Sequence, residues 1–378
     1  MTTRIGLNLL WLVPGEVGGS ETWAVGLLDA VAASSPAGVQ PVLYCSPAFA
    51  EAYPWLATAF ETCAAPHLGS SRVGRIAAES TWLAAATRRS RVSAVHHLGG
   101  TVPLVRSTPS ILTIHDLQPL HFPEHFAGAK LTYLKRRLPP SVRASRIVTT
   151  VSEFSRADVI ERLGADPART VVTPPAVDPD PAPGPVDVAQ IARIHRLDGP
   201  WFLYPAVTWR HKDHAVLLHA LAEVHRTNPE VLLVLTGAAG PEEATLTALA
   251  ERLGVAPRVR RPGRVPAAHL DALYRGAVAL AFPSRFEGVG LPVLEAMARR
   301  CPVVAADATA LPEVVGDAGV LAPPGDAAQW AAELVALLEK PARRRALADA
   351  GELRIRRWAP HASAAALVDA WRRGTAGP

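Results

Sequence analysis

Two glutamates, Glu287 and Glu295, stand eight positions apart in the stretch SRFEGVGLPVLEAM (284–297), with Gly288 and Gly290 between them. Backbone N–H groups at the start of a helix have no partner inside the helix, and such amides bind phosphate. Pro292 suits the first turn of a helix because its missing N–H is not needed there. A carboxylate close to bound phosphate is suited to the vicinal hydroxyl groups of a ribose. The spacing predicts a nucleotide site in which Glu295 holds the ribose and Glu287 lies beside the transferred group.

A purely structural role for both acids is the alternative. Glu295 would then complement the dipole of its helix, and Glu287 would be a solvated loop acid. A single acid would favour this alternative, whereas two acids around G-x-G-L-P favour the nucleotide site.

The same stretch resembles the E-x7-E signature of the retaining glycosyltransferases of the GT-B fold, in glycosyltransferase family 4. Further segments resemble this family in the same order and at similar spacing, so that the resemblance spans most of the chain: TIHDLQPLHFPEHF (113–126), VSEFSRADVIERLG (151–164), YPAVTWRHKDHAVLLHAL (204–221) and RRCPVVAADATALPEVVGDAGVLAPPGD (299–326).

The resemblance implies a role for each residue of the donor site. Glu287 is expected to contact the donor sugar, and Glu295 to hold the ribose. The amides of Gly288, Val289, Gly290 and Leu291 are expected to face the diphosphate and the sugar, and Lys212 in WRHKDH is expected to neutralise the diphosphate. Many members of the family carry a further arginine where this chain has AVTW, and Arg210 or His211 is expected to take its place.

The first half of the chain contributes two further expectations. His115 follows a strand and matches a family histidine near the transferred sugar, so that a catalytic role is implied for it, although a lone histidine is more often structural. The loop GEVGGSET (15–22) matches the family's first glycine-rich loop, which implies that Gly18 and Gly19 approach the donor phosphate. The loop lacks the G-x-G-x-x-G spacing of a dinucleotide fingerprint.

The resemblance also implies the chemistry. No D-x-D stands where it could hold a metal-bound diphosphate, and no His/Cys/Asp cluster has the spacing of metal ligands. No cofactor and no metal are therefore expected, and Lys212 and helix amides would meet the charge of the leaving group. The expected reaction transfers a hexose with retention of configuration, by attack on the face from which the phosphate leaves. GDP-mannose is the first expectation for the donor, with dTDP-rhamnose or a UDP-sugar as alternatives. The acceptor would be a glycan or a lipid-linked glycan.

Two other classes of protein are alternatives to a glycosyltransferase. A catalytically silent protein that binds a sugar nucleotide would have the same fold, but the joint presence of Glu287, Glu295, Lys212 and His115 argues against it. An NAD-linked oxidoreductase is disfavoured by the missing fingerprint. Nucleic acid is not an expected partner because no reader motif appears.

The elements that position these residues alternate between short apolar runs and helical stretches, which indicates an α/β fold with parallel sheets. Strands are predicted at 5–13, 41–46, 94–99, 110–116, 146–152, 201–207, 231–237, 277–284 and 302–307. Prolines in TPPAVDPDPAPGPVDVAQ (173–190) interrupt the alternation. Two Rossmann-like domains are therefore expected to face each other across a cleft: residues 1–177, a proline-rich linker at 178–195, and residues 196–358. The resemblance implies that residues 359–378 form a helix that returns to the first domain, with Trp358 and Trp371 as its anchors.

Composition and charge narrow the class of protein. The chain has 378 residues, of which 49% are hydrophobic and 19% are charged, as in globular proteins. Its three cysteines are widely spaced, which suits a reducing cytoplasm. Residues 126–150 carry six Lys or Arg side chains and no acid (Lys130, Lys135, Arg136, Arg137, Arg143, Arg146). This segment predicts either a helix that contacts an anionic membrane, at the inner face of the plasma membrane, or a solvated helix face.

Overall fold

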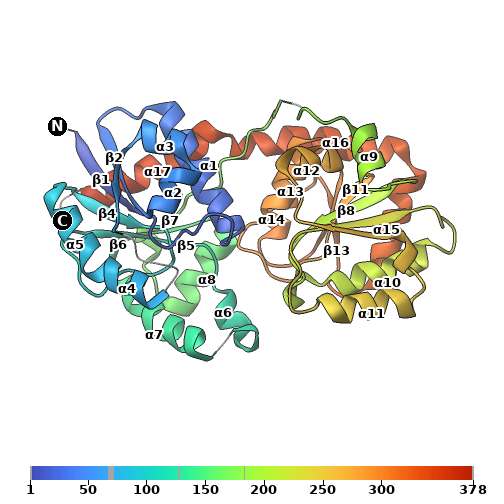
Figure 1. Cartoon of the computed structure of the whole chain (residues 1–378), viewed down its shortest axis with the longest axis horizontal. Helices are drawn as coiled ribbons and strands as arrows, with labels where there is room; N and C mark the ends of the chain where they lie inside the picture. Colours follow the sequence, from blue (N-terminus) through green and yellow to red (C-terminus); the bar gives the residue numbers. More distant parts are fainter. Residues whose placement is uncertain (1, 67–71, 127, 183, 377–378) are drawn as a thin grey trace. The chain divides into compact units, whose positions relative to one another are not determined.

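The computed structural model describes residues 2–66, 72–126, 128–182 and 184–376 (Figure 1). The chain forms two compact units, of which unit 1 comprises residues 1–176 and 358–378 and unit 2 comprises Val177–Arg357. Each unit has its own parallel sheet and its own buried core. The prediction of two Rossmann-like α/β domains is confirmed.

Unit 1 contains, among its described residues, a seven-stranded sheet in the order β3-β2-β1-β4-β5-β6-β7. Every recorded strand pair in it is parallel. The strands are β1 (Thr3–Asn8), β2 (Val39–Cys45), β3 (Glu61–Ala64), β4 (Ala94–His97), β5 (Ser110–Ile114), β6 (Ser145–Thr150) and β7 (Thr170–Val172). The chain order reverses between β1 and β4, and ligands of such sheets bind outside the carboxyl ends of the strands at this point.

Unit 2 contains, within the described ranges, a six-stranded parallel sheet in the order β10-β9-β8-β11-β12-β13. Its strands are β8 (Trp201–Pro205), β9 (Leu232–Thr236), β10 (Val259–Gly263), β11 (Ala279–Phe282), β12 (Val303–Ala306) and β13 (Val320–Ala322). Here the order reverses between the neighbouring strands β8 and β11. The loops that follow these two strands contain Lys212 and Glu287.

Helices cover both faces of each sheet. In Figure 1, α1 and α17 lie on one face of the unit 1 sheet, and α7 and α8 lie on the other. The helices of unit 1 are α1 (Gly19–Ser34), α2 (Pro47–Ala52), α3 (Pro54–Ala59), α4 (Arg72–Ser80), α5 (Trp82–Arg89), α6 (Gln118–His121), α7 (Gly128–Ala144), α8 (Glu153–Leu163) and α17 (Pro360–Thr375). Those of unit 2 are α9 (Val188–Ile194), α10 (His214–Val224), α11 (Glu243–Arg252), α12 (Ala267–Gly276), α13 (Leu291–Ala298), α14 (Leu311–Val315), α15 (Ala327–Glu339) and α16 (Pro341–Ile355). No helix of the described ranges is both long and apolar enough to span a bilayer.

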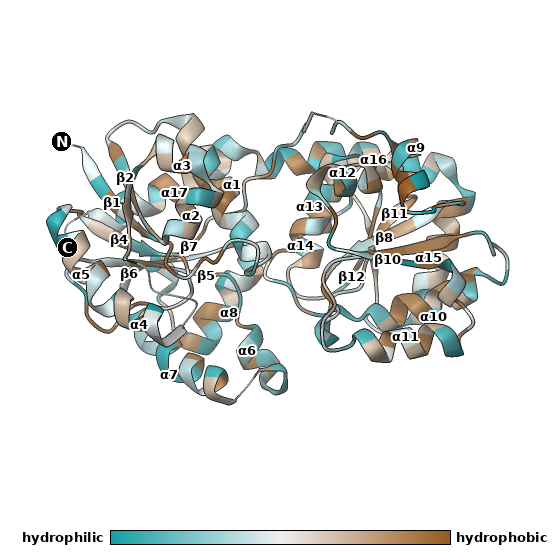
Figure 2. Ribbon diagram, viewed as in Figure 1, coloured by the Kyte–Doolittle hydropathy of each residue, from teal (hydrophilic) through white to brown (hydrophobic). Residues whose placement is uncertain are grey.

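The predicted strands correspond to the buried centres of the two sheets. Every residue of β4, β5, β9, β11 and β12 is buried, and several strands of the unit 2 sheet appear as brown, hydrophobic ribbons in Figure 2. The first strand is shorter than predicted. β1 ends at Asn8, whose side-chain oxygen accepts a hydrogen bond from the Leu10 N–H at 3.2 Å and turns the chain out of the sheet.

The C-terminal helix α17 belongs to unit 1, as predicted, and it packs against α1. Trp371 is fully buried, and its Nε1–H donates to His96 Nδ1 at 3.0 Å. His96 Nε2 then carries the ring proton and donates to Thr113 Oγ1 at 2.8 Å. The last helix is therefore joined to strands β4 and β5 by a buried hydrogen-bond chain.

The stretch predicted as a linker is partly regular. Residues 188–194 form α9, which belongs to unit 2 and packs against α12. Asp187 caps this helix by accepting the Gln190 N–H at 2.6 Å, and Ile191 is fully buried. A short capped helix with one apolar anchor follows the prolines directly, so that the irregular segment ends earlier than residue 195.

Candidate functional site

The turn between β11 and α13 in unit 2 has the shape that the glycines predict. Gly290 is the residue before α13 and has φ +88°, a left-handed conformation that favours glycine. A Cβ atom on Gly290 would also lie 2.7 Å from Leu311 Cδ2. The first helical residue is Leu291, followed by Pro292. The turn brings the amides of residues 288–291 to the helix start, where an anion can be bound.

Lys212 and Glu287 are in direct contact at the β8–β11 reversal point. Lys212 ends the 3-10 turn Arg210–Lys212 after β8, and its Nζ lies 2.5 Å from Glu287 Oε1. Both side chains are partly exposed, at 19% and 14%. The Glu287 N–H donates to Thr309 Oγ1 at 3.0 Å, which fixes the backbone that presents the carboxylate. The two predicted residues therefore form one charged pair that a ligand can reach.

Tyr204 lies beneath this pair. Its side chain is fully buried, and its hydroxyl donates to the Lys212 carbonyl at 2.7 Å. Burial, followed by the charges of Glu287 and Asp213, raises the Tyr204 pKa well above its ordinary value. Tyr204 is therefore a neutral donor that holds the Lys212 turn in place.

Glu295 lies on α13, at the fifth helical residue. The Tyr274 hydroxyl, on α12, donates to Glu295 Oε2 at 2.9 Å. Burial raises the Glu295 pKa, and the Tyr274 hydrogen bond and the Arg299 charge oppose that rise. Tyr274 occupies one carboxylate oxygen of Glu295, and the pair is a suitable acceptor for the hydroxyl groups of a sugar or ribose.

The cations near the missing arginine do not single out a replacement. Arg210 is exposed on the 3-10 turn. The Arg285 N–H donates to the His211 carbonyl at 2.8 Å, and the Arg285 guanidinium donates to Asp213 at 2.7 Å. Arg285 is thus a further cation beside this turn. The sequence did not indicate this, because Arg285 lies far from Arg210 and His211 along the chain.

His115 in unit 1 is enclosed by aromatic rings. The ring centroids of Trp23 and Trp11 lie 4.8 and 5.9 Å from its own. The Leu98 carbonyl accepts from His115 Nε2 at 3.0 Å, which leaves Nδ1 as the acceptor of the neutral ring. Burial lowers the His115 pKa to about 4. His115 is therefore neutral at pH 7, and any part in catalysis rests on hydrogen bonding.

The glycine-rich loop of unit 1 is held by an acid that the sequence did not single out. Gly18 precedes α1 with φ +77°, and Gly19 is the first helical residue. Glu21 is buried, and its two carboxylate oxygens accept the Gly15 N–H at 2.9 and 3.0 Å. The Tyr53 hydroxyl also donates to Glu21. Glu21, in the first turn of α1, therefore holds the start of the loop at Gly15 close to the helix. The contact resembles a capping box, except that the acid reaches back to a residue before the N-cap Gly18.

The structure thus groups the predicted residues by unit. Lys212, Glu287, Glu295 and the amides of residues 288–291 lie in unit 2 around the β11–α13 turn, whereas His115, Gly18 and Gly19 lie in unit 1. Tyr204, Tyr274, Thr309 and Glu21 were missed because each acts through a partner distant in the chain or through a local loop contact. Within the described ranges, no group of three or more His, Cys, Asp or Glu side chains could hold a metal ion.

Two family models match the chain, one in each half. Residues 17–181 match the model described as Glycosyltransferase Family 4, and residues 190–354 match the model described as Glycosyl transferases group 1. The first match covers Gly18, Gly19 and His115, and the second covers Lys212, Glu287 and Glu295.

Curated relatives include glycosyltransferases of two kinds. The O-antigen chain mannosyltransferase B of Escherichia coli is 33% identical over 233 residues, which are 61% of this chain and 61% of the relative. The D-inositol 3-phosphate glycosyltransferase of Segniliparus rotundus is 36% identical over 246 residues, which are 60% of this chain and 52% of the relative. The matched part spans between half and two thirds of the length of these relatives.

Solved structures agree over nearly the whole chain. A glycosyltransferase from Rickettsia africae superposes with a TM-score of 0.75 at 14% identity, covering 100% of both chains. The Anabaena protein HepE, solved in complex with UDP and glucose, superposes with a TM-score of 0.75 at 19% identity, covering 98% of this chain and 99% of HepE. The chain therefore has the GT-B fold of these solved glycosyltransferases, and its two halves are similar to the models described as Glycosyltransferase Family 4 and Glycosyl transferases group 1.

Proposed function

We propose that the protein is a retaining hexosyltransferase that transfers mannose from GDP-mannose to a glycan or a lipid-linked glycan. The Lys212–Glu287 pair carries this proposal, because it places a cation and a carboxylate together at the reversal point of the unit 2 sheet. The mannosyltransferase relatives support mannose as the sugar. A catalytically silent protein of the same fold is not favoured, since such a protein would not need this charged pair.

The proposed roles follow from the contacts. Glu295, held by Tyr274, accepts the ribose hydroxyl groups. The amides of residues 288–291 and Lys212 bind the diphosphate, with Arg210 as a further cation at the same turn. Glu287 lies beside the sugar and orients its hydroxyl groups while it keeps Lys212 in position. We propose that Lys212 and the helix amides supply the charge that a bound metal would otherwise supply.

The transfer step then needs no residue that forms a covalent bond with the sugar. The bond between the anomeric carbon and the phosphate oxygen breaks, and the acceptor hydroxyl forms a new bond on the same face of the sugar. The acceptor proton passes to the leaving phosphate, which also takes the electron pair of the broken bond. In this scheme His115 accepts a hydrogen bond from a hydroxyl group of the sugar through its Nδ1 lone pair, and Gly18 and Gly19 approach the donor phosphate.

The acceptor and the site of action are part of the same proposal. The three widely spaced cysteines suit a reducing cytoplasm, and we propose that the protein acts there, at the inner face of the plasma membrane. Residues 130–146 place six cations on or next to α7, and five of them are exposed. Such a helix can hold the protein at an anionic bilayer that contains lipid-linked acceptors. Residue 127 of the predicted segment lies outside the described residues.

A thermal-shift panel tests the donor. The protein would be heated with GDP, UDP, dTDP and ADP and with their sugar conjugates, because a ligand at a hundred times its Kd stabilises the folded state by about 2.7 kcal/mol. We expect the largest shift with GDP-mannose. A larger shift with dTDP-rhamnose or a UDP-sugar would identify that compound as the donor in place of GDP-mannose. No shift with any of the compounds would contradict the transferase proposal.

Turnover with the selected donor would then be measured with and without EDTA, and with mannosyl glycans, lipid-linked glycans and inositol 3-phosphate as acceptors. We expect full activity in EDTA, because Lys212 and the helix amides meet the charge on the phosphate. Loss of turnover in EDTA that Mg²⁺ or Mn²⁺ restores would contradict the role given to Lys212.

A further inference from the structure

The positive charge of the chain is concentrated in one part of unit 1. Residues 80–152 contain ten Lys or Arg side chains and two acids, Asp116 and Glu124, whereas the whole chain has a net charge of only +5. Arg88 and Arg89 end α5, and the six cations of residues 130–146 lie on or next to α7. Nine of the ten cations are exposed, Arg137 being the exception. The positive charge of this segment therefore faces the solvent.

Two apolar side chains protrude from the loop between β4 and β5, in the middle of this sequence. Leu104 is 71% exposed and Val105 is 58% exposed, and the next residue, Arg106, is exposed as well. A single exposed leucine is common on protein surfaces and needs no explanation. Leu104 and Val105 differ from that case because they are two adjacent exposed apolar side chains on one loop.

Contacts with α7 hold one end of this loop. Val102 is 1% exposed and packs among Leu138 and Val142 of α7. Its N–H donates to Ser141 Oγ at 3.0 Å, and its carbonyl accepts from the Arg137 guanidinium at 2.5 Å. Val102 and α7 therefore fix the base of the loop just before the two exposed side chains.

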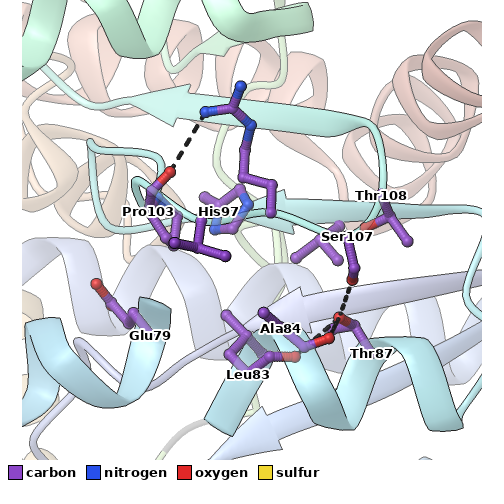
Figure 3. A pocket seen from close by; sticks show the side chains of 11 residues that line it. Glu79, Leu83, Ala84, Thr87, His97, Pro103, Ser107 and Thr108 are labelled. Carbon is purple, nitrogen blue, oxygen red and sulfur yellow. Dashed lines mark hydrogen bonds between the residues drawn. The ribbon is translucent and has the colours of Figure 1, made fainter. Parts of the chain in front are cut away.

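Contacts with α5 hold the other end. Figure 3 shows Ser107 facing Thr87 of α5, and their hydroxyl oxygens lie 2.9 Å apart. Arg106 Nη1 donates back to the Pro103 carbonyl at 3.4 Å and spans the tip. The same loop forms one wall of a pocket whose other wall is α5. Leu104 and Val105 are thus presented by a loop that is attached to both cationic helices.

We propose that the loop 101–109, together with the cations of α5 and α7, docks unit 1 onto an anionic lipid bilayer, with Leu104 and Val105 inserted among the acyl chains. A membrane surface matches both features at once, because anionic headgroups attract the cations and the hydrocarbon takes up the apolar tip. Nucleic acid would satisfy the cations but would leave Leu104 and Val105 in water. This inference gives the membrane contact proposed above its apolar anchor, and it does not depend on the transfer reaction.

Vesicle sedimentation tests the surface. The full chain would be mixed with vesicles of phosphatidylcholine alone or of phosphatidylcholine with phosphatidylglycerol. We expect binding only to the anionic vesicles, and release at high salt. The double variant L104S/V105S should bind about tenfold more weakly, because the apolar contribution is lost while all the cations remain. R88S/R89S should also bind more weakly: the affinity for anionic vesicles should fall by about fivefold for each removed arginine that contacts the membrane.

Matched variants separate the anchor from a general effect. Leu353→Ser removes a side chain of unit 2 that is 66% exposed, and it should leave vesicle binding unchanged. Val105→Trp should strengthen binding, because tryptophan favours the membrane interface. Binding of L104S/V105S equal to that of the wild type would overturn the proposal, as would a wild-type protein that ignores anionic vesicles or that binds RNA as tightly as it binds vesicles.

The donor thermal shift of L104S/V105S separates this inference from the enzymatic proposal. A normal shift with the donor together with loss of vesicle binding supports the membrane surface. A wild-type chain that shows a donor shift and transfers sugar but never binds vesicles refutes the membrane surface and leaves the transferase proposal in place.

Discussion

Glu287 and Lys212 form an ion pair at the centre of the proposed unit 2 site, and this contact links the roles proposed for the two residues. The Lys212 ammonium lies 2.5 Å from the Glu287 carboxylate. A bound diphosphate would share this ammonium with Glu287. In the proposed site, Lys212 would therefore lie between the diphosphate and the carboxylate beside the sugar. An ion pair that a ligand can reach is suited to this exchange of partners, because neither charge is sealed in the core.

Glu287→Gln should act on the chemical step. The amide keeps the size of the side chain but removes the negative charge that, in the proposed role of Glu287, stabilises positive charge on the sugar in the transition state. We expect turnover to fall by about a hundredfold or more, while the affinity for the bare nucleoside diphosphate falls by no more than about threefold. Steady-state kinetics and calorimetric titration of the diphosphate would measure the two effects.

The exposed Glu251 supplies the control for this variant, because Glu251→Gln removes a charge from α11 in the same unit. It should leave both quantities unchanged. Near-normal turnover of Glu287→Gln would identify Glu287 as a solvated loop acid with no part in transfer.

Glu295→Ala should weaken nucleotide binding itself. Two hydrogen bonds to the ribose, worth about 1–3 kcal/mol each, would be lost. We expect the affinity for the nucleoside diphosphate to fall by at least about tenfold. Tyr274→Phe should cause a smaller loss, because it removes the hydroxyl that holds the carboxylate but leaves the carboxylate itself. Equal affinity of Glu295→Ala and the wild type in calorimetric titration would remove Glu295 from the ribose site.

At the scale of the elements, sequence patterns did not predict four strands. All four are edge strands of the two sheets. β3, β7, β10 and β13 each lie at the end of a sheet order. Their burial is incomplete, and all five residues of β10 are only partly buried, whereas β11 and β12 are buried throughout. A strand with a neighbour on one side only needs no continuous apolar run, so it lacks the signal by which the central strands are recognised.

The docking of α17 onto unit 1 gives a prediction at this scale. Trp371→Phe keeps an aromatic ring in the core but removes the N–H that donates to His96 Nδ1. The His96 acceptor would be left buried without its donor, so we expect the free energy of unfolding of unit 1 to fall by about 1–3 kcal/mol. Urea unfolding followed by hydrogen exchange in unit 1 peptides would measure the loss.

Arg372→Ala, on the same helix, is the matched control. Arg372 is exposed, and its guanidinium donates to the Ala37 carbonyl at 3.3 Å, so the change in stability should stay within about 0.5 kcal/mol. A loss equal to that of Trp371→Phe would mean that α17 is held by general packing and not by the hydrogen bond to His96.

At the scale of the whole molecule, the two units should differ in their response to acid. Unit 1 contains two buried histidines, His96 and His97, and the partly buried His115, and desolvation lowers their pKa values to about 3, about 3 and about 4. In the unfolded chain these rings titrate near 6.5, so between about pH 6.5 and 4 the unfolded state binds more protons than the folded state. Stability must therefore fall as the pH falls through this window.

We expect each of these histidines to cost on the order of 1 kcal/mol per pH unit in that window. The buried Glu79, whose pKa is raised by burial, acts in the opposite direction and offsets a part of the loss. In unit 2, burial lowers the pKa of His214 to about 3 and also lowers the pKa of His195. Hydrogen exchange at pH 7 and at pH 5 should show the larger loss of protection in unit 1, and equal losses in both units would contradict this account.

Sequence alone determined the central strands, the two α/β domains and the β11–α13 turn, because apolar runs, glycines and a proline act over short distances along the chain. It also indicated Glu287, Glu295 and Lys212 as site residues. Tertiary structure decided which of them touch: Lys212 and Glu287 meet because β8 and β11 are neighbours in the sheet although 75 residues separate the two side chains. Tyr274 beside Glu295, Trp371 against His96 and the loop held between α5 and α7 likewise depend on contacts between distant segments, and hydrophobic periodicity carries no information on such pairings.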